Sequence, residues 1–189
     1  MSLLVTAAQT IGPFGAIIFE HTQTAEIAPA GVAGERVVIR GRVLDGDGQP
    51  VDDAMIETWQ ANSFGKFAHP DDAQEKPLDE RFRGFGRVQS GSDGSFRCST
   101  IKPGRAPGPG GAMQAPHLAV VIFMRGLLKH LVTRVYFPDD AANADDPVLK
   151  LVPAARRATL IARKIAAEPG VFEWNVNLQG RDETVFFDC

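Results

Sequence analysis

The sequence is poor in the residues from which metal sites and nucleophilic sites are usually built. Its 189 residues include one tyrosine, two cysteines and four histidines. No serine lies in a G-x-S-x-G turn, and neither a Walker motif nor a G-x-G-x-x-G segment between a predicted strand and helix is present. These absences exclude the common patterns of serine hydrolases and nucleotide-binding proteins.

Long apolar runs and blocks of like charge are also absent. No stretch approaches the roughly 20 residues of a membrane span, and the start has no basic region before its short apolar run. The 20 basic and 23 acidic residues are interspersed, without the basic stripe of a nucleic-acid-binding protein. We therefore expect a cytoplasmic protein, in which Cys98 and Cys189 are unpaired thiols.

The abundant residues favour an all-β fold. With 19 Gly, 13 Pro and 44% hydrophobic residues, the composition is typical of one β-domain with numerous turns. We expect the first two predicted strands to pair with each other, the fourth and fifth to form a hairpin, and an amphipathic helix to follow at residues 153–165. Apolar runs and alternation predict strands at residues 36–43, 54–60, 95–101, 117–125, 131–138, 171–178 and 184–187.

Two segments have little periodicity. Residues 1–34 contain several breakers, among them Gly12 and Pro13, and predict an extended arm with at most a short helical turn. Such an arm has to pack against something, and residues 35–189 are expected to form the single sandwich domain. Residues 61–87 predict a long loop anchored by aromatic side chains, and long loops in compact domains are usually functional or disordered.

One histidine stands where a metal ligand would be expected. His117 heads the strongly apolar strand 117–125, but Ala119 lies two residues on, on the same strand face. A His-x-His pair there would converge on one ion, whereas His-x-Ala does not. His130 lies at the opposite end of the expected hairpin, about 26 Å away at the usual strand rise, so it cannot share an ion with His117.

A mixed metal site in the long loop stays open on the sequence alone. His69 stands close to Asp71 and Asp72, although exposed loop carboxylates are usually only solvated. The two tryptophans, Trp59 and Trp174, are on separate predicted strands. We expect them in the core or at a subunit interface.

Several stretches, in order along the chain, resemble the intradiol ring-cleavage dioxygenases. The match covers most of the chain, and QAPH, TRVYF and ETVFFD are specific to the alpha-type subunit of members built from two kinds of chain. The resemblance implies a β-sandwich of the intradiol dioxygenase type, with transthyretin- or immunoglobulin-like layers. The matching stretches are QTIGPF (9–14), GRVLDGDGQPVDDAMIETWQAN (41–62), GFGR (84–87), TIKPG (100–104), QAPHLAVVIFMRG (114–126), HLVTRVYFPDD (130–140), DPVL (146–149), RRATLIARK (156–164) and GRDETVFFD (180–188).

The resemblance also implies a partner, the beta subunit, which holds Fe(III) with two tyrosines and two histidines. In this chain the four ligand positions fall on Gln74, Ala106, His117 and Ala119, and the assisting arginine becomes Gln114. The position of Gln74 in this match is fixed only to within a residue or two. One tyrosine in the whole chain cannot supply a two-tyrosine site. We expect neither a metal nor a catalytic residue in this chain.

What the chain would contribute is the wall of the partner's substrate pocket. By resemblance, Thr10, Gly12, Pro13 and Arg134 take this role. The reaction implied is the insertion of both atoms of dioxygen between the hydroxyl-bearing carbons of 3,4-dihydroxybenzoate, giving 3-carboxy-cis,cis-muconate, in a higher-order hetero-oligomer. The alternative is a stand-alone β-sandwich binding module without a catalytic role.

Overall fold

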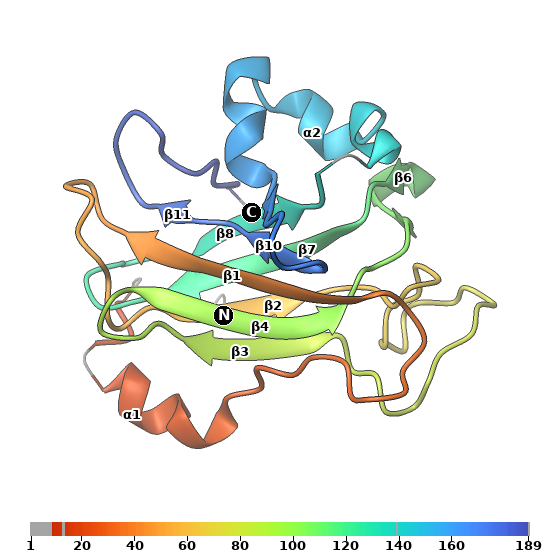
Figure 1. Ribbon diagram of the computed structural model, residues 1–189, viewed down its shortest axis with the longest axis horizontal. Helices are drawn as coiled ribbons and strands as arrows, with labels where there is room; N and C mark the ends of the chain where they lie inside the picture. Colours follow the sequence, from red (N-terminus) through yellow and green to blue (C-terminus); the bar gives the residue numbers. More distant parts are fainter. Residues whose placement is uncertain (1–8, 13, 139, 189) are drawn as a thin grey trace, which may run out of the picture.

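One antiparallel sheet and one mixed sheet pack face to face in the computed structural model, which describes residues 9–12, 14–138 and 140–188 (Figure 1). The first sheet has the order β3-β2-β7-β8, and all its neighbours are antiparallel. Its strands are β2 (Met55–Trp59), β3 (Phe85–Gln89), β7 (His117–Phe123) and β8 (Leu131–Tyr136). The expected hairpin of residues 117–125 and 131–138 is therefore confirmed.

The second sheet is built around one long strand, β1 (Arg36–Leu44). β1 pairs antiparallel with β4 and parallel with β10 and β11, and β10 continues to β9. These strands are β4 (Ser95–Ile101), β9 (Arg163–Lys164), β10 (Val171–Glu173) and β11 (Val176–Asn177). The all-β sandwich that the composition predicts is confirmed.

Inward-facing aliphatic residues of both sheets form the core. Every second residue of β1 and β7 is buried, including Ile39, Val43, Leu118 and Ile122, none of which exposes more than 2% of its surface. Within the second sheet, the close approach of β1 to the segment between β10 and β11 depends on Gly41, because a Cβ there would lie 1.7 Å from the Trp174 carbonyl oxygen.

The expected pairing of the first two strands is wrong. β1 and β2 lie in opposite sheets, and β2 pairs with β3 and β7. The turn after β1 folds back on its own strand, with a bridge between Leu44 and Pro50 and a bond from Val51 N to Val43 O of 2.9 Å. The chain crosses to the other sheet only after this turn.

The strand β3 (Phe85–Gln89) begins in the last residues of the segment 61–87 expected to be a loop and continues beyond it. Its inward positions are Gly86 and Val88, and a Cβ on Gly86 would lie 2.5 Å from Ile27 Cγ1. Apolar alternation does not reveal such a strand, because the inward residue is a glycine that admits a neighbouring side chain.

The expected helix at 153–165 is a shorter 3₁₀ helix, η4 (Ala154–Leu160). The chain then leaves the helix, because Ala162 N donates to Tyr136 O (3.0 Å) and Arg163 and Lys164 form β9. Residues 171–178 form two short strands, and 184–187 make only a bridge from Phe187 to Val132. Two further helices, η3 (Ala141–Ala144) and α2 (Pro147–Leu151), lie between β8 and η4 along the chain.

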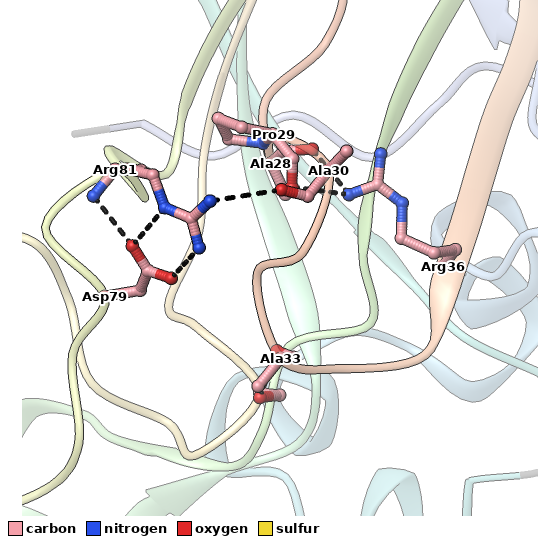
Figure 2. A network of polar contacts seen from close by, with 8 residues as sticks. Ala28, Pro29, Ala30, Ala33, Arg36, Asp79 and Arg81 are labelled. Atoms are coloured by element: carbon pink, nitrogen blue, oxygen red, sulfur yellow. Dashed lines mark hydrogen bonds and ion pairs between the residues drawn. The ribbon is translucent and has the colours of Figure 1, made fainter.

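The later part of the arm, around Ile27 and Ala28, packs on the sandwich of the same chain. Ile27 and Ala28 are buried, and Ile27 N donates to Ser99 O (2.8 Å). Figure 2 shows two arginines reaching this segment: Arg36 donates to the carbonyl oxygens of Ala28 and Pro29, and Arg81, paired with Asp79, donates to that of Ala30 (3.3 Å). Contact of the arm with a partner stays a prediction.

The outer part of the arm forms a short helix, α1 (Gly15–Phe19), followed by a 3₁₀ turn, η1 (Glu20–Thr22). This agrees with the expected short helical turn. Among the described residues, no helix is long and apolar enough to cross a membrane.

Candidate functional site

The outer face of the β7–β8 hairpin brings several predicted positions together. His117 pairs with Tyr136, and Ala119 pairs with Arg134. Directly opposed residues of an antiparallel pair point to the same face, so these four side chains share one surface. Trp59 of β2 pairs with Ala119 from the other side.

The remaining predicted ligand positions border the same surface. Ala106 belongs to β5 (Ala106–Pro107) and pairs with Gln114 of β6 (Met113–Gln114), a small hairpin that also contains the turn η2 (Pro109–Gly111). Gln74, Pro107 and Trp59 line one cavity of about 610 Å³. The structure therefore gathers Gln74, Ala106, Gln114, His117 and Ala119 in one region of the molecule.

A hydrogen-bonded network fills this region. Arg134 Nη1 donates to Gln114 Oε1 and to the Tyr136 hydroxyl (3.3 Å). The Tyr136 hydroxyl donates to Asp146 Oδ1 (3.2 Å), and Asp146 Oδ2 accepts from Ala115 N (2.7 Å). The side-chain oxygens of Gln114 and Tyr136 therefore accept hydrogen bonds from Arg134, and the Tyr136 hydroxyl also donates to the buried Asp146, so both side chains are already engaged.

Burial determines the protonation states of His117 and Tyr136. Burial, together with the nearby Arg134 charge, lowers the pKa of His117 to about 4, so the imidazole is neutral at physiological pH. Its Nδ1 lies 2.7 Å from Ala115 O. Burial raises the pKa of the Tyr136 phenol well above its usual range, so a tyrosinate ligand is disfavoured there.

The donor set does not fit a ferric ion. Ala106 and Ala119 carry no donor atom, and Gln74 uses its amide to donate to Gly65 O (2.9 Å) and Asp72 Oδ2 (3.0 Å). Among the described residues there is no group of three or more His, Cys, Asp or Glu side chains that could hold a metal ion. Hard anionic oxygen donors, which ferric iron favours, are missing at these positions.

The possible mixed site in the long loop is not formed. His69 Nδ1 lies 3.7 Å from Asp71 Oδ2, and the Asp71 side chain is 93% exposed. Asp72 instead turns toward backbone amides and accepts from Phe67 N (2.7 Å) and Gln74 N (3.0 Å). Burial raises the pKa of Asp72, but these hydrogen bonds outweigh it and the net pKa is lowered. His69 and Asp71 thus make an exposed pair.

The predicted pocket-wall residues lie in two places. Thr10 Oγ1 accepts from Gly126 N (3.0 Å) and donates to Met124 O (3.3 Å), just beyond the far end of β7. This is about 17 Å along the strand from Ala119, the partner of Arg134. The single chain does not bring Thr10 and Arg134 together.

Gly12 has a φ of +67°, and a Cβ there would meet no atom within 4 Å, so backbone conformation and not crowding favours glycine. Pro13 lies outside the described residues, as does Cys189. Cys98 is buried and free, and burial raises the pKa of its thiol to about 12.

The two tryptophans lie in different surroundings. Trp174 is a core residue, 4% exposed, and donates from Nε1 to Thr159 O (2.9 Å), as expected. Trp59 stacks on Phe67 with ring centroids 6.2 Å apart and lines the cavity beside Gln74.

Sequence reasoning missed Asp146. Its side chain caps α2, accepting from Val148 N (2.9 Å) and Leu149 N (2.8 Å), and it anchors the network through Tyr136. The signal was present in the dipeptide Asp146-Pro147, since an aspartate before a proline is a common helix start.

Comparison with known proteins identifies the family. A family model described as "Dioxygenase" matches residues 18–180. The chain is 45% identical to the protocatechuate 3,4-dioxygenase alpha chain of Burkholderia cepacia over 99% of its own length and 98% of the relative's. The chain belongs to the intradiol dioxygenase family.

Other family members match the chain less closely. The protocatechuate 3,4-dioxygenase beta chain of Burkholderia cepacia is 37% identical over 95% of this chain and 78% of its own length. Among solved structures, the dioxygenase domain from Streptomyces sp. SirexAA-E superposes with a TM-score of 0.64 at 23% identity, covering 86% of this chain and 89% of that one. This last likeness supports the fold alone. The family resemblance expected from the sequence is confirmed.

Proposed function

We propose that this chain is the iron-free alpha subunit of a protocatechuate 3,4-dioxygenase and completes the substrate pocket of an iron-bearing beta subunit. Two observations together carry the proposal. The chain is 45% identical to an alpha chain over nearly its full length, and the side chains at its predicted ligand positions cannot hold iron. Ala106, Ala119 and Gln74 stand where the resemblance implies ligands. The assembly is an oxidoreductase, and this chain alone is inactive.

The reaction proposed for the assembly is intradiol cleavage of 3,4-dihydroxybenzoate. Dioxygen adds both of its atoms to the substrate, the bond between the two hydroxyl-bearing carbons breaks, and 3-carboxy-cis,cis-muconate forms. Fe(III), supplied by the beta subunit, would activate the bound catecholate toward oxygen. This chain's own residues have the task of binding and orienting the substrate.

Arg134 is suited to the carboxylate of such a substrate. Both of its hydrogen bonds, to Gln114 and Tyr136, use Nη1. In the part of the chain that the structure describes, Nη2 and Nε meet no protein acceptor, which leaves them for a carboxylate. A guanidinium held on one side by neutral partners keeps its charge and its orientation. Thr10, Gly12 and Pro13 would contribute to the wall of a partner pocket from the arm.

Expression with and without the partner tests the proposal. The chain purified alone is expected to contain no stoichiometric iron and to cleave no 3,4-dihydroxybenzoate. Coexpression with a beta chain should give a hetero-oligomer with ring-cleaving activity and the red colour of tyrosinate-to-iron charge transfer. Iron and activity in the isolated chain would overturn the proposal, and a monomer that ignores the beta chain would favour the stand-alone binding module.

A further inference from the structure

An arginine on β3 is held on several sides at once. Arg87 pairs with Glu57 directly across the β2–β3 ladder, and Nε donates to Glu57 Oε1 (2.8 Å). The Arg87 and Glu57 side chains are only 20% and 21% exposed. A planar guanidinium in such an ion pair is fixed in orientation.

The other contacts of Arg87 are largely to the arm. The guanidinium carbon lies 4.8 Å from the centre of the Phe19 ring and 5.4 Å from that of Phe85, so the cation contacts one aromatic ring of the arm and one of β3. Nη1 donates to Thr22 Oγ1 (2.8 Å). The backbones of Arg87 and Thr24 exchange two hydrogen bonds, of 2.7 and 3.2 Å.

The arm is tied at its other end by Thr10. Its hydroxyl bonds to Met124 and Gly126, as described above. Between Thr10 and Phe19 lies α1, a helix of five residues without a side-chain cap. A helix this short is not stable by itself, so its position has to come from the attachments at its two ends.

The outward side of α1 is apolar. Phe14, Ile17 and Ile18 expose 67%, 66% and 66% of their surfaces. These residues directly follow Thr10 and Gly12, which the proposed function places in the wall of the partner's pocket. Whatever fixes α1 therefore also fixes the pocket-wall residues beside it.

We propose that Arg87, acting through Phe19 and Thr22, is a positioning residue that holds the arm ready for the substrate pocket of the beta subunit. This inference rests on the proposed function. An arm that is already ordered costs less free energy to dock than one that has to be ordered on binding. Loss of the Arg87–Phe19 contact then leaves α1 less well held at this end, so that Gly12, between α1 and the Thr10 attachment, is less well placed and substrate binding weakens.

The test uses Phe19→Leu, which removes the ring over Arg87 and leaves the ion pair with Glu57 intact. Phe85→Leu is the matched control, because it removes the ring on the β3 side of the same guanidinium without touching the arm. Arg87→Lys keeps the charge but loses both the planar stack and the Nη1 bond to Thr22, so it should loosen the arm at least as much as Phe19→Leu.

Hydrogen exchange of the isolated chain gives the first measurement. In Phe19→Leu the amides of residues 15–22 should exchange about 3- to 30-fold faster, the range expected for loss of one cation–π contact. Amides in β2 and β7 should keep their wild-type rates, and Phe85→Leu should leave the arm within about twofold of wild type. Unchanged exchange at residues 15–22 would show that Arg87 does not order the arm.

Kinetics of the assembled enzyme give the second measurement. Phe19→Leu should raise KM for 3,4-dihydroxybenzoate by a similar factor, with kcat within about twofold and iron content unchanged. Faster exchange with an unchanged KM would overturn the positioning role. If the wild-type chain forms no assembly with a beta chain, the proposed function fails, while the exchange measurement still decides whether Arg87 orders the arm.

Discussion

At the scale of single residues, Arg134 offers a permanent charge beside two lost ligand positions. In the assembled enzyme, Arg134→Ala should raise KM for 3,4-dihydroxybenzoate by roughly tenfold or more, because a charge-assisted hydrogen bond is worth about 1.5–3 kcal/mol. A catechol without a carboxylate should be affected much less. Steady-state kinetics and iron analysis check this, with Arg97→Ala, an exposed arginine of β4, as the control. Unchanged kinetics would remove Arg134 from the pocket.

His117 makes a pH-dependent contribution to stability. Its folded pKa of about 4 lies below the unfolded value of about 6.5, so between these values the unfolded chain binds a proton that the folded chain does not. Stability should therefore fall by about 2 kcal/mol as the pH drops from 6.5 toward 4.5. His117→Gln should lose this part of the pH dependence in urea unfolding. His21→Gln, an exposed substitution, should retain it; equal pH profiles for the two variants would contradict the assignment.

At the scale of elements, α2 depends on Asp146, the residue that caps its N-terminus. Asp146 is fully buried and accepts from three backbone amides and one hydroxyl. Asp146→Ala should destabilise the fold by about 3 kcal/mol, since it removes a helix cap and leaves Ala115 N without its acceptor. Its neighbour Asp145 has a side chain that is 78% exposed, so Asp145→Ala should change stability by less than about 0.5 kcal/mol. Chemical denaturation compares the two; equal effects would show that burial of Asp146 contributes nothing.

Some strands of this fold can be predicted from the sequence, and other features of the fold cannot. The alternation in β1, β4 and the β7–β8 hairpin predicts those strands because each buries one full face. Alternation does not predict β3, where Gly86 is the inward residue. It also does not predict that β1 and β2 separate, because either arrangement buries the same apolar faces. The helix expected at 153–165 ends early because Ala162 bonds to β8, a contact between distant parts of the chain.

At the scale of the whole molecule, the candidate site combines predictable and unpredictable parts. The missing ligands are visible from residue types alone, since Ala106 and Ala119 have no donor and the chain has one tyrosine. What replaces the ligands is not visible there. Arg134, Tyr136 and Asp146 meet only after β8 and α2 pack together, and their hydrogen bonds satisfy polar groups in the region where the resemblance places a metal. The sandwich can therefore keep the family's shape without binding iron.

The exposed apolar side of α1 leads to a prediction about assembly. Ile17 is 66% exposed and lies on the arm that we expect to pack on the beta subunit. Ile17→Asp should leave the thermal stability of the isolated chain within about 0.5 kcal/mol of wild type, as is usual for surface substitutions. In coexpression it should reduce copurification of the beta chain at least tenfold, because a charge placed in an apolar interface loses its hydration without gaining a partner.

The matched control is Leu151→Asp, which places the same charge on α2 at a residue that is 82% exposed. This variant should copurify with the beta chain at wild-type yield, because α2 lies on the opposite side of the sandwich from α1 (Figure 1). Equal loss of the beta chain in both variants would indicate a general effect of surface charge. Full retention of the beta chain by Ile17→Asp would remove α1 from the interface and leave Thr10 as the arm's remaining link to the partner's pocket.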